Sequence, residues 1–455
     1  MNPPISTLHC QHPRPQHLTI ANLLFDEHYL LELAIATGFY RRVPRKIDIC
    51  SLLSAICAES VKGSPSCNDL AASIENTHPG YGPSRQAVHL RMGDSFHTFI
   101  HRILEDLIGG GRPGGGPFSV NTEDSVQKFA GYTRVLVQDS TVIKLPTHLF
   151  EKFSGVSNSH SKVCNARVQA IYDLLAQRMI GFSIDPYSKN DLKAAPELPL
   201  EAGDLVLRDR GYLTQNEIQR HLDAGADCIY RHKTGTTYLD PHSGVPIDLV
   251  KMLRQKGNLD ITVLLNNEAR TPVRLVSAPV KEETANLRRM KARKETHGHN
   301  PSAAVLALMD WTILITTIPL QKADFLTLLA LYGLRWRIEV IFKAWKGHMK
   351  FDNLHRVSKN QMLILLKARL FLITCSTNIL HRSLESTLWQ KHRRRISLLK
   401  LIGFLAASPA NILRALASLT LTDSENIGFH YALLRYCCYD RRKRMNYSDL
   451  WVLLA

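Results

Sequence analysis

Three acidic residues stand where their chemistry could be used together. Asp139 interrupts a strand pattern rich in Val and Ile at 134–145, Asp209 follows a short apolar strand pattern, and Glu339 belongs to a helical stretch. A carboxylate within a strand is costly unless it has a partner, so Asp139 is either a ligand or the cap of a bulge or turn. Three convergent carboxylates suit two Mg²⁺ or Mn²⁺ ions, which activate an attacking hydroxyl and stabilise the leaving oxygen at phosphorus. The pattern therefore predicts metal-dependent phosphoryl transfer.

The stretch 331–350, LYGLRWRIEVIFKAWKGHMK, is predicted to form one helix with an apolar face and a polar stripe. On a helical wheel the stripe, which spans roughly 60°, carries a phenol, a guanidinium, a carboxylate and an ammonium: Tyr332, Arg335, Glu339 and Lys346. Cations beside the acids could hold a phosphate and its developing charge, and Arg210 is a further candidate. The alternative is a surface ion pair between Arg335 and Glu339, worth a few tenths of a kcal/mol.

Composition favours a nucleic-acid partner. The 455 residues carry a formal net charge of +17, and the nine cysteines include no C-x-x-C pair. A zinc site or disulfide framework is therefore not expected; reduced thiols favour the cytoplasm, and the positive charge favours association with nucleic acid. Charged residues interrupt the longest apolar runs, and the first 20 residues lack an apolar signal core, so neither a membrane span nor a secretory signal is predicted.

The length predicts more than one domain. Residues 1–20 are expected to be disordered, and 21–108 to form a helical DNA-binding domain. In that domain Pro65-Ser66 and Pro83-Ser84 begin two helices that could form a helix-turn-helix-like DNA reader or an ordinary bundle. The glycine-rich run 109–117 is expected to be a linker, since it lacks the Lys-Ser/Thr ending of a phosphate-binding loop.

Beyond the linker the pattern changes to the α/β class. A catalytic core is predicted from 118–213 and 311–375, as a mixed sheet flanked by helices. Between them, 214–310 is expected to be a β-rich insertion, and 376–455 a helical C-terminal region. His297 and His299 in the insertion are expected to be solvated rather than to bind a metal, because a lone H-x-H in a polar loop is a weak signal.

The spacing of these motifs resembles the DDE insertion-sequence transposases of the "IS four" type. Their Y-R-E-K signature is present in full as Tyr332-x-x-Arg335-x-x-x-Glu339 followed by Lys346, and Asp139-Ser-Thr and Asp209-Arg-Gly-Tyr look like the family's two Asp motifs. The resemblance implies an RNase H-like core with a β insertion, Mg²⁺ dependence and cut-and-paste DNA chemistry. It implies that Asp139, Asp209 and Glu339 hold the metal, while Tyr332, Arg335 and Lys346 hold the DNA backbone near the cleaved phosphate.

The resemblance also implies a homodimer acting on double-stranded DNA, namely paired terminal inverted repeats and a target. In hairpin-forming relatives an aromatic residue of the insertion stacks on a flipped base, and Trp311 looks like its counterpart; the alternative is a core tryptophan. Two other functions stay open from the sequence: a catalytically inactive transposase-derived DNA-binding protein or repressor, and a metal-dependent nuclease that cuts without joining.

Overall fold

The structure is a computed structural model of the whole chain. It describes residues 19–41, 47–80, 82–109, 131–155, 163–295, 300–355, 357–421 and 423–440. The linker residues 110–117, His297, His299 and most of the expected disordered N-terminus lie outside these residues. Thr19 and Ile20 are described, and they contradict the expected disorder to residue 20: Thr19 caps a helix that begins at the buried Ile20.

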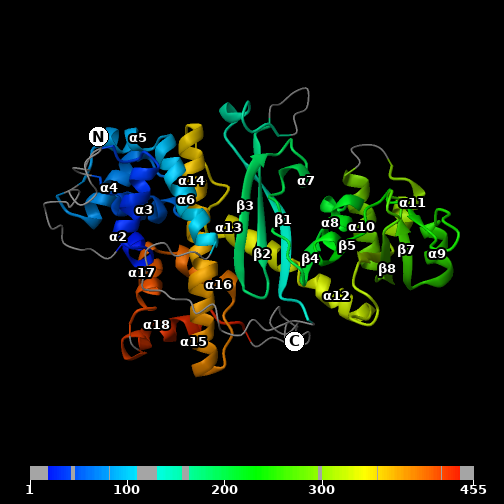
Figure 1. The fold of residues 1–455 in the computed structure, drawn as a ribbon. Coiled ribbons are helices and arrows are strands. Elements are labelled where there is room, and N and C mark those ends of the chain that lie inside the picture. Colours follow the sequence, from blue (N-terminus) through cyan, green and yellow to red (C-terminus); the bar gives the residue numbers. More distant parts are fainter. Residues whose placement is uncertain are drawn as a thin grey trace.

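A nine-stranded mixed sheet runs through the middle of the molecule and to one end of it (Figure 1). The strand order is β3-β2-β1-β4-β5-β9-β8-β7-β6. Only the pairs β1–β4 and β4–β5 are parallel; the other neighbours are antiparallel. The strands are β1 (Arg134–Lys144), β2 (Asn165–Asp173), β3 (Arg178–Pro186), β4 (Asp204–Arg208), β5 (Asp227–Arg231), β6 (Tyr238–Leu239), β7 (Leu259–Leu265), β8 (Pro272–Pro279) and β9 (Trp311–Thr316).

Strand β1 separates two hydrophobic cores because its side chains alternate between the faces of the sheet. Val135, Val137 and Ile143 belong to a core shared with the helices, whereas Leu136 belongs to a second core on the other face. This alternation fixes which way each polar residue of the strand can point.

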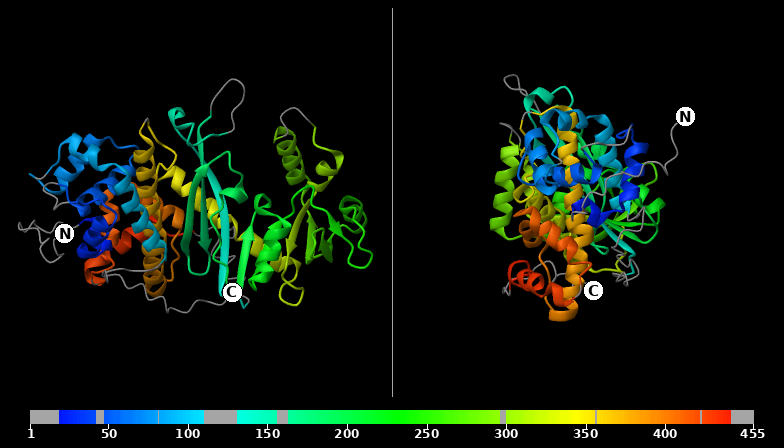
Figure 2. Two further views of the ribbon diagram at one scale, coloured as in Figure 1. Left: turned by 45° about the horizontal axis from the view of Figure 1, so that its top comes forward. Right: turned by 90° about the vertical axis from the view of Figure 1, so that its left-hand side faces the viewer.

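The helices of the two chain ends pack together at the other end of the molecule (Figures 1 and 2). Helices α3 and α6 both pack on α14, so segment 21–108 shares its core with the C-terminal region. The N-terminal helices are α1 (Ile20–Leu24), α2 (Glu27–Ala36), α3 (Ile49–Ser60), α4 (Cys67–Thr77), α5 (Arg85–Arg91) and α6 (Asp94–Gly109). The C-terminal helices are α14 (Lys359–Thr374), α15 (Arg382–His392), α16 (Leu398–Ala406), α17 (Pro409–Ala417) and α18 (Asp423–Tyr436).

One fully buried arginine joins the two groups of helices. Arg369 of α14 donates to the carbonyl oxygens of Ser60 (2.9 Å) and Gly63 (2.5 Å), just after α3. It also donates to the carbonyl oxygens of Phe351 (3.2 Å) and Asn353 (3.0 Å) in the loop before α14. Burial lowers the pKa of this guanidinium to about 10, because removal from water disfavours its charged form. Four backbone acceptors compensate for that cost.

Two sequence expectations need correction. The helix predicted from Arg85 onward is interrupted at Met92 and Gly93, so it forms α5 and α6. Segment 214–310 is mixed rather than β-rich, because it contains four helices besides β5 to β8: α8 (Gln215–Asp223), α9 (Leu249–Lys256), α10 (Glu282–Glu295) and α11 (Ala303–Leu308). Moreover, β5 pairs directly with β4, so this segment supplies a strand next to the one that leads to Asp209.

The longest apolar helix does not contradict the prediction that the chain has no membrane span. Helix α14, a π-helical turn (Cys375–His381) and α15 run on without a break, and this Lys359–His392 helix is long and apolar enough to span a membrane. Of its apolar window, 83% is buried inside the protein. A core helix passes the same test, so the burial identifies it as the core of the helical layer.

Candidate active site

Strands β1 and β4 bring the two predicted aspartates side by side. Their parallel register pairs Gln138 of β1 with Arg208 of β4. The residues that follow these two are Asp139 and Asp209. Asp139 lies within β1, where the backbone N–H of Ser140 donates to its Oδ1 (2.8 Å). Asp209 follows the end of β4 and precedes a 3₁₀ turn, Arg210–Tyr212. The sequence prediction that Asp209 lies at a strand end is confirmed.

The predicted helix 331–350 is two helices, which corrects the sequence analysis. Helix α12 (Phe325–Gly333) ends at a glycine, a weak helix former, and α13 (Trp336–Gly347) begins three residues later. Across the junction the backbone makes i to i+3 hydrogen bonds, such as Arg335 N–H to the Tyr332 carbonyl (3.1 Å). The junction places Arg335 at the start of α13.

An apolar face docks α13 against the sheet, as the sequence predicts. Ile338, Ile341, Phe342 and Trp345 are buried, and α13 packs on β1. The Trp345 ring lies among aromatic rings, with centroid distances of 5.0 Å to Phe342 and 5.6 Å to Phe182 of β3. This packing holds the polar stripe of α13 over the part of β1 that carries Asp139.

Arg335 joins two of the three acids. Its Nη1 donates to Asp139 Oδ2 (2.8 Å) and its Nη2 to Glu339 Oε1 (2.5 Å). The expected ion pair between Arg335 and Glu339 therefore exists, but it is half of a bridge between strand and helix. Burial would lower the pKa of Arg335, yet Tyr332, Asp139 and Glu339 together raise it above its ordinary value. The guanidinium therefore stays charged.

Tyr332 and Lys346 complete the stripe. The Tyr332 hydroxyl donates to Asp209 Oδ1 (3.3 Å), and burial raises its pKa, so the phenol keeps its proton. Lys346 donates from Nζ to the carbonyl oxygen of Val142 (2.7 Å), three residues along β1 from Asp139. Burial lowers the pKa of this ammonium, partly offset by Asp352. All six residues of the predicted triad and signature thus lie at one place, linked through Arg335, Tyr332 and β1.

The acids of this cluster have the donor chemistry of a divalent-cation site, although Arg335 already balances two of them. Burial raises the pKa of Asp139 to about 6; Arg335 lowers it, and the neighbouring Asp209 and Glu339 raise it further. The three carboxylates are the hard oxygen donors that Mg²⁺ and Mn²⁺ prefer. In the described part of the chain no three acidic, histidine or cysteine side chains are gathered closely enough to hold a metal. A cation at the triad would therefore take the role that Arg335 has between Asp139 and Glu339.

Arg210 and Trp311 lie together in a neighbouring pocket. Arg210 is exposed, and Trp311, at the start of β9, donates from Nε1 to the carbonyl oxygen of Gly257 (3.1 Å). Trp311 is half-buried at the margin of the second core, so it is not a fully buried core tryptophan. The pocket is lined by Arg210, Arg231, His232, Thr234, Arg288, Leu308, Met309, Trp311 and Ile313.

Sequence reasoning missed Arg231 and Arg288 of this pocket. Burial, with Arg231 nearby, lowers the pKa of Arg288, which donates to the carbonyl oxygen of Trp311 (3.0 Å). Arg231 is the last residue of β5, which lies two strands from β1 in the sheet. Its position at the end of a strand was the only signal that the sequence offered. It also missed Asp191, whose carboxylate accepts from Ser140 Oγ (2.7 Å).

The chain is similar in sequence to known transposases. The family model "Transposase DDE domain" matches residues 131–376, which include every residue of the triad and its signature. The transposase for insertion sequence element IS231D of Bacillus thuringiensis subsp. finitimus is 25% identical over 301 residues, covering 61% of this chain and 62% of that protein. The transposase for IS1151 of Clostridium perfringens is 25% identical over 313 residues, covering 63% and 64%. The chain thus spans less than two thirds of the length of these relatives.

Among solved structures, one match is the cryo-EM structure of a piggyBac transposase synaptic complex with hairpin DNA. It covers 94% of this chain and 86% of that one, at 10% identity and a TM-score of 0.44. At that level the likeness bears on neither the fold nor the activity of this chain.

Proposed function

The chain belongs to the transposase DDE domain family, and from this premise we propose that it catalyses cut-and-paste transposition of an insertion sequence. The reaction is metal-dependent cleavage of phosphodiester bonds at the element ends, followed by transesterification into target DNA. The observation that carries the proposal is the convergence of Asp139, Asp209 and Glu339 from two adjacent strands and one helix, joined by Arg335 and Tyr332.

In this proposal the strands β3-β2-β1-β4-β5, with α13, form the RNase H-like catalytic unit. The chain between β5 and α12 is then the insertion, which begins later than the sequence boundary at residue 214, because β5 pairs with β4. The catalytic acids lie on β1, directly after β4 and on α13, so all three are held by regular elements rather than by long loops. Rigid elements hold a catalytic constellation more precisely than loops do.

Asp139, Asp209 and Glu339 would hold one or two Mg²⁺ or Mn²⁺ ions. When bound, such ions lower the pKa of the attacking hydroxyl and stabilise the leaving oxygen. The protein's own part is to orient the acids. Ser140 N–H fixes one oxygen of Asp139, and Tyr332 fixes one oxygen of Asp209.

Cations of the stripe are proposed to hold the DNA backbone beside the triad. Arg335 presents a planar fork that can exchange its carboxylate partners for a phosphate, to which guanidinium binds in the same bidentate way. Lys346 brings a point charge to the same stretch of β1. The pocket of Arg210, Arg231 and Arg288 next to Trp311 combines phosphate-binding groups with an aromatic surface, and we assign it to a nucleotide near the cut.

The net charge of +17 supports double-stranded DNA as the partner, with terminal repeats and target both bound. We further propose that helices α1 to α6 contribute to that binding and that the active form on paired ends is a homodimer.

The test uses the purified full chain and duplex DNA that carries the sequences flanking its gene. With Mn²⁺ or Mg²⁺, the wild-type protein should nick at the element ends and join them to a plasmid. Asp139→Ala, Asp209→Ala and Glu339→Ala should abolish both steps and retain the gel shift in EDTA. The matched control is Glu268→Ala, an exposed acid in the turn between β7 and β8, which should cleave at the wild-type rate.

Each other outcome identifies a different function. Cleavage by any one of the three alanine variants at the wild-type rate would remove that residue from the triad. A persistent gel shift with no metal-dependent cleavage in the wild-type protein would favour a repressor. Cutting without joining would favour a simple nuclease.

A further inference from the structure

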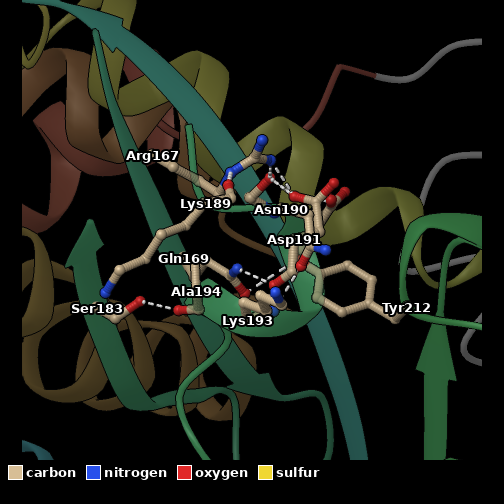
Figure 3. Close-up of polar contacts among 11 residues, drawn as sticks. Arg167, Gln169, Ser183, Lys189, Asn190, Asp191, Lys193, Ala194 and Tyr212 are labelled. Atoms are coloured by element: carbon tan, nitrogen blue, oxygen red, sulfur yellow. Dashed lines mark hydrogen bonds and ion pairs between the residues drawn. The ribbon is translucent and has the colours of Figure 1, made fainter. Parts of the chain in front are cut away.

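A polar network supports the catalytic strand from the face of the sheet opposite α13. Successive side chains of a strand point to opposite faces, so Asp139 meets Arg335 on one face and Ser140 points to the other. There Ser140 Oγ donates to Asp191 Oδ1 (2.7 Å). Asp191 is the first residue of the short helix α7 (Asp191–Ala194), which Asn190 caps (Figure 3).

The Asp191 carboxylate is balanced by Arg167 of β2. Arg167 Nη1 donates to Asp191 Oδ1 and to Ser140 Oγ (3.2 Å), and its Nε donates to the carbonyl oxygen of Lys189 (3.2 Å). The Arg167 guanidinium also lies over the Tyr187 ring, 4.6 Å from its centroid. Asp191 Oδ1 therefore already has two donors, which makes it poorly suited to be a metal ligand.

The same residue contacts the turn that follows Asp209. A Cβ placed on Gly211 would lie 3.2 Å from Asp191 Oδ2, so a larger residue in this turn would push against the Asp191 side chain. The backbone carbonyl of Asp191 accepts from Gln169 Nε2 (2.5 Å), and Gln169 Oε1 accepts from the Tyr212 hydroxyl (3.0 Å), as Figure 3 shows. Gln169 is fully buried and pairs with Ser140 across β1 and β2.

We propose that Asp191 is a positioning residue that sets the distance between Asp139 and Asp209, an inference that rests on the proposed function. Its carboxylate accepts from the residue after Asp139 and lies against Gly211, and its carbonyl is linked to Tyr212 through Gln169. The proposal assigns to Asp191 no contact with DNA or metal. Loss of this link leaves both ligands present but free to spread apart, which weakens metal binding without removing a ligand. Loss of such supporting partners typically costs about 10- to 100-fold in metal affinity.

The experiment compares Asp191→Ala, Asp191→Asn and Ser140→Ala with the wild-type full chain. The first readout, without DNA, is the Mn²⁺ concentration that gives half of the maximal rise in thermal midpoint. The second is cleavage of the element ends as Mn²⁺ is raised. Asp191→Ala should move both half-saturation points upward about 10- to 100-fold, with cleavage returning towards the wild-type rate at high Mn²⁺.

Asp191→Asn should move them less than Asp191→Ala, because its amide oxygen still accepts from Ser140. Ser140→Ala should raise both half-saturation points as well. The double variant, Ser140→Ala with Asp191→Ala, should raise them by less than the two single shifts combined. The control is Asp185→Ala, which loses only the pair between Asp185 Oδ1 and Lys189 Nζ (2.6 Å) and should leave half-saturation unchanged.

For Asp191→Ala, two results would overturn the proposal: a half-saturation within twofold of the wild-type value, or a loss that no Mn²⁺ concentration restores, as in Asp139→Ala. If Asp191→Ala does not fold, Asp191→Asn and Ser140→Ala decide, and unchanged half-saturation in both would overturn it. A wild-type thermal midpoint that does not change with Mn²⁺ would also overturn the proposal. Because the first readout needs no DNA, a wild-type protein that binds Mn²⁺ but never cleaves would refute the proposed function while the shifts still test Asp191.

Discussion

Arg335→Met should destabilise the metal-free protein by about 2 kcal/mol. The change removes two charge-assisted hydrogen bonds, to Asp139 (2.8 Å) and Glu339 (2.5 Å), each worth about 1.5–3 kcal/mol when buried. The two carboxylates are 19% and 27% exposed, so water replaces part of that loss. Side-chain ordering contributes little to the difference, because buried Arg and Met each lose about 1.5–2 kcal/mol of rotamer freedom. About 2 kcal/mol remains, or a fall in thermal midpoint of a few degrees.

The same change should increase the response to metal. In the wild-type protein a divalent cation must displace Arg335 from Asp139 and Glu339, whereas in Arg335→Met it meets acids without their internal cation. We therefore expect Mn²⁺ to raise the midpoint of the variant more than that of the wild type, in DNA-free protein measured by calorimetry. The control is Arg102→Met, which loses an exposed pair with Glu105 (3.7 Å) and should change stability by less than about 0.5 kcal/mol. A midpoint for Arg335→Met equal to that of the control, or equal Mn²⁺ responses in variant and wild type, would refute the reasoning.

Three further outcomes are expected. Lys346→Met should lower the cleavage rate at least tenfold, with a stability change under about 1 kcal/mol because the ammonium bonds only one carbonyl of β1. The control is Lys343→Met, on the exposed side of α13 over Trp336. Equal cleavage rates in the two variants would contradict the role of Lys346. Arg369→Met should lower the unfolding free energy in urea by about 3 kcal/mol or more, since four backbone carbonyls lose their donor and two of these hydrogen bonds are fully buried. A loss below about 1 kcal/mol would count against this expectation. The fragment 131–376 should lack cooperative unfolding and a near-ultraviolet circular dichroism signal, because it lacks the helices that cover α14. A sharp thermal unfolding transition of the fragment would show that the core shared by the N- and C-terminal helices is dispensable.

Much of the site could be predicted from local sequence because its parts are local. The Val and Ile of 134–145 predict a strand around Asp139, the apolar run before Asp209 predicts a strand end, and helical spacing puts Glu339 beside Arg335. That Asp139 and Asp209 are neighbours depends on the parallel pairing of β1 and β4, which no periodicity encodes. The residue types suggested that acids on a sheet and a helix could converge, and the family resemblance implied that these ones do.

The features that were missed depend on tertiary packing. Arg335 is one turn from Glu339, but its second partner, Asp139, is 196 residues away. Asp191 has an ordinary position at the start of a short helix, and only the fold brings it to Ser140. The predicted continuous helix was wrong at Gly333 because helical spacing of side chains survives a short i to i+3 junction.

The buried arginine of α14 has a consequence for the order in which the protein is made. Ser60 and Arg369 are 309 residues apart in the chain. At about 5–20 residues per second, a ribosome needs roughly 15 to 60 s to make the chain between them. During that interval α3 has left the ribosome, but the helix that covers it does not yet exist. The N-terminal helices therefore reach their final packing only after the whole catalytic unit has been synthesised, and each nascent chain exposes part of its future core for that time.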